Sequence, residues 1–128
     1  MKLLLDTHTA IWFVTDSKQL PTPTKKLIEN IENQCFVSIA TLWEMGIKYS
    51  LGKLKLKAEL GKIFELFLDS GFIILPITPE HILTNATLPF QHRDPFDRLI
   101  ISQAKREGYT IISKDMEFEK YEVNLRWN

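Results

Sequence analysis

Four acidic side chains stand where strands are expected to end or helices to begin. They are Asp6, Glu44, Asp97 and Asp115. Asp6 follows the apolar run Leu3–Leu5, and Asp115 follows the segment Thr110–Ser113. Ligands of open α/β sheets bind outside the carboxyl ends of the strands. Carboxylates that meet there repel one another unless a cation joins them, and oxygen ligands suit Mg²⁺ or Mn²⁺. The residues therefore predict a site for a divalent metal ion.

The elements that would position these acids alternate between short apolar strands and amphipathic helices. We expect strands over residues 2–5, 35–38, 72–77, 109–113 and 123–125. We expect helices over residues 9–14, 22–32, 41–50 and 60–68, a further helix from Pro79, and another from Pro95 to Gly108. Thr22, Thr78 and Asp94 each precede a proline, which is typical of a helix N-cap. The alternation predicts one α/β domain over residues 1–128 with a mostly parallel sheet.

Composition and charge exclude several classes of protein. A length of 128 residues suits one domain with a substantial core. The single cysteine, Cys35, excludes an internal disulfide and a multi-cysteine zinc cluster, and it suits a reducing cytoplasm. No apolar stretch approaches the ~18 residues of a membrane span. The formal net charge of +0 gives no general attraction to nucleic acid, so a phosphate group would be held by local basic side chains or by metal.

Asp6 and Asp115 have the same surroundings, an acid placed directly after a buried strand. Each has two interpretations, as a cap for the helix that follows or as a metal ligand. Two such acids on parallel strands would direct their carboxylates toward one crevice. The pair therefore supports a shared site more strongly than either residue does alone.

Glu44 has three interpretations. Thr41 and Glu44 have the spacing of a capping box, in which Glu44 would reach back to the backbone of Thr41. Glu44 and Lys48 have the spacing of an ion pair on a helix. The helix around Glu44 is rich in apolar residues, so the carboxylate is expected to be buried and to need a partner. That partner is either Lys48 or a metal ion.

Asp94 and Asp97 compete for one role. Asp94 precedes Pro95, where an aspartate accepts hydrogen bonds from the first backbone N–H groups of a helix. Asp97 lies about one turn into that helix, where the helix dipole favours negative charge but capping does not require it. We assign Asp97 to the metal site and Asp94 to the cap, and we keep Asp94 as a second-rank ligand.

The remaining candidates are basic and aromatic. His8 lies two residues after Asp6 and is placed to touch a substrate, whereas His81 is expected on an ordinary helix. The basic groups form either a solvated surface or a rim that steers phosphate. These groups are Lys48, Lys53, Lys55 and Lys57, with Arg93 and Arg98 on either side of the acidic cap. Three aromatic residues, Trp12, Phe13 and Trp43, suggest a contact surface for a partner, although packing in the core would also explain them.

Four segments around the acidic residues occur in an order that matches a known family. They are Leu4–His8, Ser38–Lys48, His92–Ile100 and Ile112–Asp115. Together they resemble a PIN domain, and most of all the VapC-type toxins of bacterial toxin–antitoxin pairs. Each segment alone is weak evidence, but four in family order across almost the whole chain form a specific pattern.

The resemblance implies an α/β/α sandwich around a mostly parallel sheet and a Mg²⁺- or Mn²⁺-dependent ribonuclease. The acidic positions of the family carry over onto Asp6, Glu44, Asp97 and Asp115, and its hydroxyl position carries over onto Ser113. Thr7, His8 and Arg98 are expected to support the site or to touch RNA. Some members lack the last acid, so Asp115 ranks below the other three. The resemblance also implies a homodimer silenced by a small antitoxin protein.

The chemistry agrees with this expectation, and two alternatives remain. Hydrolysis of a phosphodiester needs an activated water and neutralisation of charge on the phosphate, and a carboxylate-held metal supplies both. The first alternative is a catalytically silent PIN-fold module that binds RNA or regulates another protein. The second is a receiver-like signalling domain. That class has paired acids after its first strand, whereas Asp6 stands alone, and Ser38 rather than an aspartate ends the second strand.

Overall fold

The computed structural model describes residues 1–89 and 94–128. Its strands are β1 (Lys2–Leu5), β2 (Gln34–Ser38), β3 (Ile73–Leu75), β4 (Thr110–Ile112) and β5 (Leu125–Arg126). Its helices are α1 (Thr7–Val14), α2 (Thr22–Glu29), α3 (Ile39–Ser50), α4 (Leu60–Asp69), α5 (Pro79–Ala86), α6 (Pro95–Glu107) and the 3₁₀ helix η1 (Met116–Tyr121). Every predicted strand and helix is present, with shifted ends. The sequence did not predict η1.

The strands form one sheet of five in the order β3-β2-β1-β4-β5, and all neighbouring pairs are parallel. The chain moves outward from β1 to β2 and β3, and then crosses to β4 on the other side of β1. The order therefore reverses between β1 and β4, and ligands of such sheets bind in the crevice at that point. Asp6 and Ser113 directly follow these two strands.

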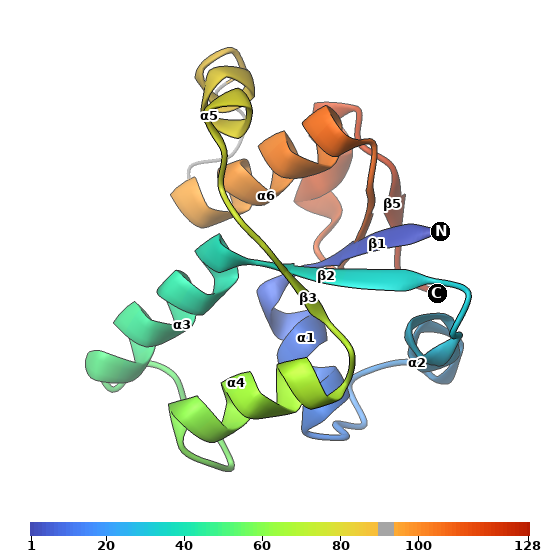
Figure 1. Ribbon diagram of the computed structural model, residues 1–128, viewed down its shortest axis with the longest axis vertical. Helices are drawn as coiled ribbons and strands as arrows, with labels where there is room; N and C mark the ends of the chain where they lie inside the picture. Colours follow the sequence, from blue (N-terminus) through green and yellow to red (C-terminus); the bar gives the residue numbers. More distant parts are fainter. Residues whose placement is uncertain (90–93) are drawn as a thin grey trace.

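Each face of the sheet carries its own hydrophobic core, because successive residues of a strand point to opposite faces. Leu3 and Leu5 belong to one core, which α1, α2, α3 and α4 cover. Leu4 belongs to the other, which includes Ile100 of α6 and Phe118 of η1. Figure 1 shows α6 on one side of the strands and α1 and α4 on the other. The predicted three-layer α/β/α sandwich is confirmed.

Two predicted helix caps are wrong. The backbone of α3 begins at Ile39, and Ser38 is its N-cap, with the Ser38 hydroxyl accepting from the Ala40 N–H at 3.0 Å. Because a serine at the end of β2 already caps the helix, Thr41 lies inside it and the predicted capping box does not form. In α2 the N-cap is Pro21, which has no side chain able to cap, so Thr22 is the first helical residue.

The helices on the other face begin as predicted. Thr78 caps α5, and His81 completes a capping box in which its Nδ1 accepts from the Thr78 N–H at 3.0 Å. His81 lies on a helix as predicted, and it is buried, with its Nε2 3.2 Å from Glu107 Oε1, so it joins α5 to α6. Gly108 ends α6 at φ 75°, a conformation that glycine adopts without strain, and the chain then enters β4.

Among residues 1–89 and 94–128, no helix is both long enough and apolar enough to cross a membrane.

Candidate active site

Asp6 is both a helix cap and a buried acid at the crevice. Its carboxylate accepts from the Thr9 N–H at 3.0 Å and from the Ser113 hydroxyl. Burial raises the pKa of Asp6, and the hydrogen bonds from Ser113 and Thr9 oppose that shift only in part. The Thr9 hydroxyl donates to the Ile112 carbonyl at 2.9 Å, which fixes the start of α1 against the end of β4. The cap interpretation of Asp6 is therefore confirmed, and its role as a metal ligand stays a prediction.

Ser113 connects Asp6 to Asp115. Its hydroxyl donates to Asp6 and accepts from the Asp115 N–H at 2.9 Å, and its side chain is fully buried. Asp115 is exposed, and its carboxylate caps η1 by accepting from the Glu117 N–H at 2.9 Å. Ser113 is therefore placed to orient the acids rather than to touch a substrate.

Glu44 is held from two sides. It is only 4% exposed, and its Oε1 accepts from the Thr7 hydroxyl at 2.6 Å. Its Oε2 lies 2.6 Å from Lys48 Nζ, so the predicted ion pair is confirmed. The hydrogen bond that Lys48 donates to Glu44 raises the pKa of Lys48, and the carboxylates of Asp94 and Asp97 raise it further. Thr7 thus has a supporting position, and the Lys48 ammonium lies among the acids.

Asp94 caps α6 as predicted, and the assignment of Asp97 to a metal site stays a prediction. Asp94 Oδ1 accepts from the N–H groups of Phe96 at 2.9 Å and Asp97 at 3.2 Å. Asp97 accepts none of these cap bonds, and burial raises its pKa to about 8. Four carboxylates add to that rise by repulsion, and in decreasing order they are Asp94, Glu44, Asp6 and Asp115. The structure therefore brings the predicted acids into one electrostatic cluster.

The donors of this cluster suit a divalent cation in chemistry and charge. All are carboxylate oxygens, which Mg²⁺ and Mn²⁺ prefer, and their repulsion adds to the effect of burial on the pKa of Asp97. In the described part of the chain, no three side chains of the types that bind metal are grouped tightly enough to hold one ion. The carboxylates of Asp6 and Glu44 are directed at Ser113, Thr9, Thr7 and Lys48. Coordination would therefore require these acids to exchange hydrogen-bond partners.

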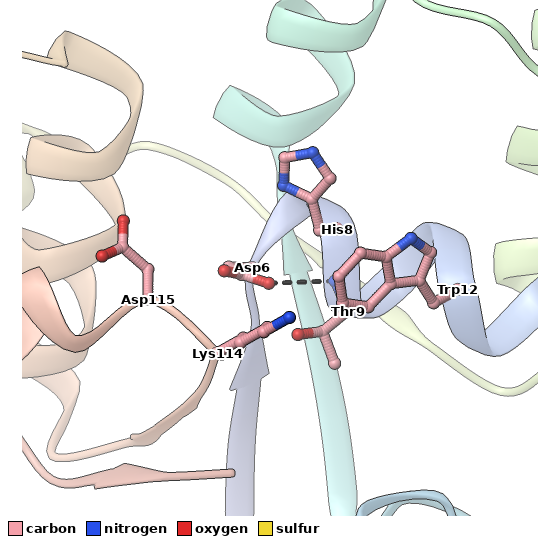
Figure 2. A pocket seen from close by; sticks show the side chains of 6 residues that line it. All are labelled: Asp6, His8, Thr9, Trp12, Lys114 and Asp115. Carbon is pink, nitrogen blue, oxygen red and sulfur yellow. Dashed lines mark hydrogen bonds between the residues drawn. The ribbon is translucent and has the colours of Figure 1, made fainter. Parts of the chain in front are cut away.

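A hollow of about 240 Å³ opens beside Asp6. Its lining residues are Asp6, His8, Thr9, Trp12, Lys114 and Asp115. Figure 2 shows His8 and Trp12 projecting from α1, with Lys114 and Asp115 on the segment that follows β4. His8 lies where a substrate contact was expected. Lys114 was missed, although it stands between two residues that the sequence had identified.

Arg98 does not belong to an exposed rim. It is buried, and its guanidinium donates to the carbonyls of Pro89 at 2.8 Å and of Asn85 and Leu88 at 3.4 Å. These contacts fix the chain after α5, so Arg98 supports the fold. Arg93 and His92 lie outside the described residues. Lys53, Lys55 and Lys57 are exposed. Their exposure agrees both with a solvated surface and with a basic rim that steers phosphate.

We expect Lys48→Met to destabilise the protein by about 1–2 kcal/mol in the presence of a chelator, because the buried Glu44 carboxylate loses its cation. Millimolar Mn²⁺ should reduce this loss if an ion takes over the charge of Lys48. Thermal melting of parent and variant measures both effects. Lys62→Met is the matched control, because Lys62 and Glu65 form an exposed pair at 3.6 Å. Equal effects of the two variants would show that Lys48 is an ordinary surface residue.

We compared the sequence and the structure with those of known proteins. No curated protein matches the sequence. The structure is similar to VapBC2 from Rickettsia felis bound to a DNA fragment from their promoter, with a TM-score of 0.76, 20% identity and 100% coverage of both chains.

Two further solved structures share the fold. VapBC-1 from nontypeable Haemophilus influenzae has a TM-score of 0.73 and 17% identity, covering 98% of this chain and 97% of that one. FitAcB from Neisseria gonorrhoeae has a TM-score of 0.68 and 19% identity, covering 96% and 95%. At such identities the likeness concerns the fold alone. The sequence itself matches the PIN domain family over residues 3–124, and the chain therefore belongs to that family.

Proposed function

We propose that this chain is a VapC-type toxin that cleaves RNA as a Mg²⁺- or Mn²⁺-dependent endoribonuclease. The observation that carries the proposal is the arrangement at the carboxyl ends of β1 and β4, where Ser113 joins the buried Asp6 to Asp115. The order of the sheet reverses between these two strands, and ligands bind at such a point. After burial, the carboxylates of Asp94, Glu44, Asp6 and Asp115 also contribute to the raised pKa of Asp97. Membership of the PIN domain family agrees with a nuclease.

Asp6, Glu44, Asp97 and Asp115 would hold the ion, and Asp94 would serve mainly as the cap of α6. When bound, a divalent ion neutralises charge on the phosphate and lowers the pKa of the attacking water. Thr7 and Ser113 hold the buried carboxylates of Glu44 and Asp6 in place through hydroxyl hydrogen bonds. Because the Ser113 hydroxyl is buried and already engaged, it is poorly placed to act as a nucleophile, which favours direct attack by water.

The proposal includes a small antitoxin protein and a homodimer. VapBC and FitAcB structures share the fold, and the sequence segments resemble the toxin partner of such pairs. An apolar patch near the acids supports a protein contact. Trp43 on α3 is 60% exposed and packs edge-on against Phe96 at a centroid distance of 5.4 Å, and Ile39 one turn earlier is 39% exposed. A cytoplasmic location fits such a pair.

Cleavage of labelled RNA by the purified chain tests the proposed activity. We expect internal cuts with millimolar Mn²⁺ or Mg²⁺, and intact RNA when a chelator replaces the metal. Single-stranded DNA of the same sequence serves as the control substrate. RNA binding without cleavage at any metal concentration would favour the silent PIN-fold module. A stable aspartyl phosphate after incubation with acetyl phosphate would favour the receiver-like domain.

A further inference from the structure

Trp12 is a wall shared by two hollows on the surface. One is the hollow of about 240 Å³ that Asp6, Lys114 and Asp115 line beside the acidic cluster. The other, of about 200 Å³, is lined by Trp12 together with Lys55 and Lys57. A ligand that leaves the acidic site past Trp12 therefore reaches a lysine-lined hollow.

The indole of Trp12 is held firmly in this position. It packs against the core beneath α1, and its ring lies 6.0 Å from the ring of Trp127. On the side of the site, the exposed ring of His8 lies 5.6 Å from Trp12, one helical turn earlier on α1. A half-buried indole fixed by neighbouring rings is a suitable platform for stacking a nucleobase.

Apolar and basic residues alternate over residues 54–57, which places the lysines on the surface. Leu54 and Leu56 pack against the core, and the intervening Lys55 and Lys57 are exposed. Asp16 also interacts with Lys57, but it is paired with Lys25 at 2.8 Å. The charges of Lys55 and Lys57 are therefore largely available to phosphate groups.

We propose that Trp12 and these lysines form a track for single-stranded RNA, with one base stacked on Trp12 and its neighbouring phosphates on Lys114, Lys55 and Lys57. This inference rests on the proposed function, and it adds a subsite outside the acidic cluster that stacks a base and binds phosphate. A hollow of about 240 Å³ is smaller than the ~300–1,000 Å³ of pockets for drug-sized ligands. Stacking on Trp12 requires a base that is free of its own helix, so the track would take a single strand.

A partner protein with an acidic segment is the competing occupant. One observation favours RNA. The two hollows share Trp12, so the track is continuous with the acidic cluster, where a phosphodiester would be cut.

Binding measured without cleavage tests the track. A fluorescent uridine octamer is titrated with the full chain in chelator, and anisotropy gives the Kd. Trp12→Leu keeps an apolar side chain against Trp127, and we expect it to weaken binding about 5- to 100-fold, the contribution of one stacked base. Trp12→Phe should recover part of that loss. Phe13→Leu is the matched control, because Phe13 on the same helix packs against Phe72 and lines neither hollow.

The salt dependence of the Kd tests the contribution of Lys55 and Lys57 separately. Changing Lys55 and Lys57 together to Gln should lower the slope of log Kd against log salt by about 1.4, since each phosphate contact on a single strand contributes about 0.7. Lys2→Gln with Lys105→Gln removes the same charge from β1 and α6, outside both hollows, and should leave the slope unchanged. The parent should bind the octamer more tightly than an RNA duplex of equal length.

Several outcomes would overturn the track. The first is that folded Trp12→Leu binds the octamer as tightly as the parent, and the second is that the parent binds duplex and single strand equally. The third is that the parent does not bind the octamer at all. The fourth is that Trp12→Leu loses affinity only for an acidic peptide of alternating glutamate and leucine, titrated in parallel, and not for RNA. Failure of the proposed function is distinguishable. If the parent binds the octamer through Trp12 but never cleaves it with Mn²⁺, the RNA track is supported and the proposed nuclease activity is refuted.

Discussion

Replacing Asp97 with asparagine is expected to abolish metal-dependent cleavage of RNA, lowering the rate by about 100- to 1,000-fold. Asparagine has nearly the shape of aspartate but removes the negative charge that several neighbouring carboxylates surround. A metal ion contributes several kcal/mol to the stabilisation of a phosphoryl transition state, and each 1.36 kcal/mol is tenfold in rate. Initial rates at saturating Mn²⁺, with circular dichroism to verify folding, measure the effect.

Asp94→Asn is the matched control for that variant. Asp94 caps α6 through the N–H groups of Phe96 and Asp97, and asparagine caps a helix about as well as aspartate. We therefore expect Asp94→Asn to retain activity within about tenfold of the parent. Equal and complete loss in two folded variants would show that both aspartates bind the ion and that the division of roles is wrong.

Asp97→Asn should also raise the stability of the protein when a chelator is present. Burial and neighbouring carboxylates raise the pKa of Asp97 to about 8, so ionising this group disfavours the folded state at neutral pH. Removing the charge should stabilise the fold by about 1–3 kcal/mol, or roughly 3–10 °C in Tm. Asp6→Asn should behave in the same direction, because burial raises the pKa of Asp6 as well.

The pH dependence of this effect follows from the sign of the shift. Below about pH 4 the Asp97 carboxyl is protonated in both the folded and the unfolded chain, so it contributes no difference. As pH rises from 3.8 toward about 8, the unfolded chain releases the proton while the folded chain retains it, and the parent loses stability. The advantage of Asp97→Asn over the parent should therefore be larger at pH 8 than at pH 5.

Metal should reverse the order of stability. The parent gains binding free energy from millimolar Mn²⁺ that the variant lacks. Asp94→Asn, which keeps its cap, should stay close to the parent in chelator. If the acids acted only as separate helix caps, every asparagine variant would be neutral or destabilised, and metal would make no difference. Destabilisation of both Asp6→Asn and Asp97→Asn in chelator would contradict a shared cluster.

The sequence predicted best what depends on local patterns. Apolar runs marked the strands, and Asp94 before Pro95 marked the start of α6. The acid after a strand predicted the cap that Asp6 forms at the start of α1, where its carboxylate is buried. Local patterns gave the wrong N-cap for α3, where Ser38 and Thr41 were both possible caps. Ser38 at the end of β2 caps α3 before Thr41 is reached, so the capping box with Glu44 does not form.

Features that depend on distant contacts could not be predicted. Arg98 carries a charge beside the cap of α6, but its burial depends on carbonyls of the segment after α5. The track around Trp12 combines Lys55 from the connection before α4 with Lys114 from the end of β4. Only the topology of the sheet and the packing of α1 bring such residues to one surface.

Direct binding of Mn²⁺ tests the shared acidic site most directly. Electron paramagnetic resonance measures free Mn²⁺ during titration of the purified chain, independently of any substrate. We predict saturable binding of one or two ions by the parent, retained binding by Asp94→Asn, and at least tenfold weaker binding by Asp97→Asn. Absence of saturable binding by the folded parent, or equal binding by the parent and Asp97→Asn, would contradict a metal site built on these carboxylates.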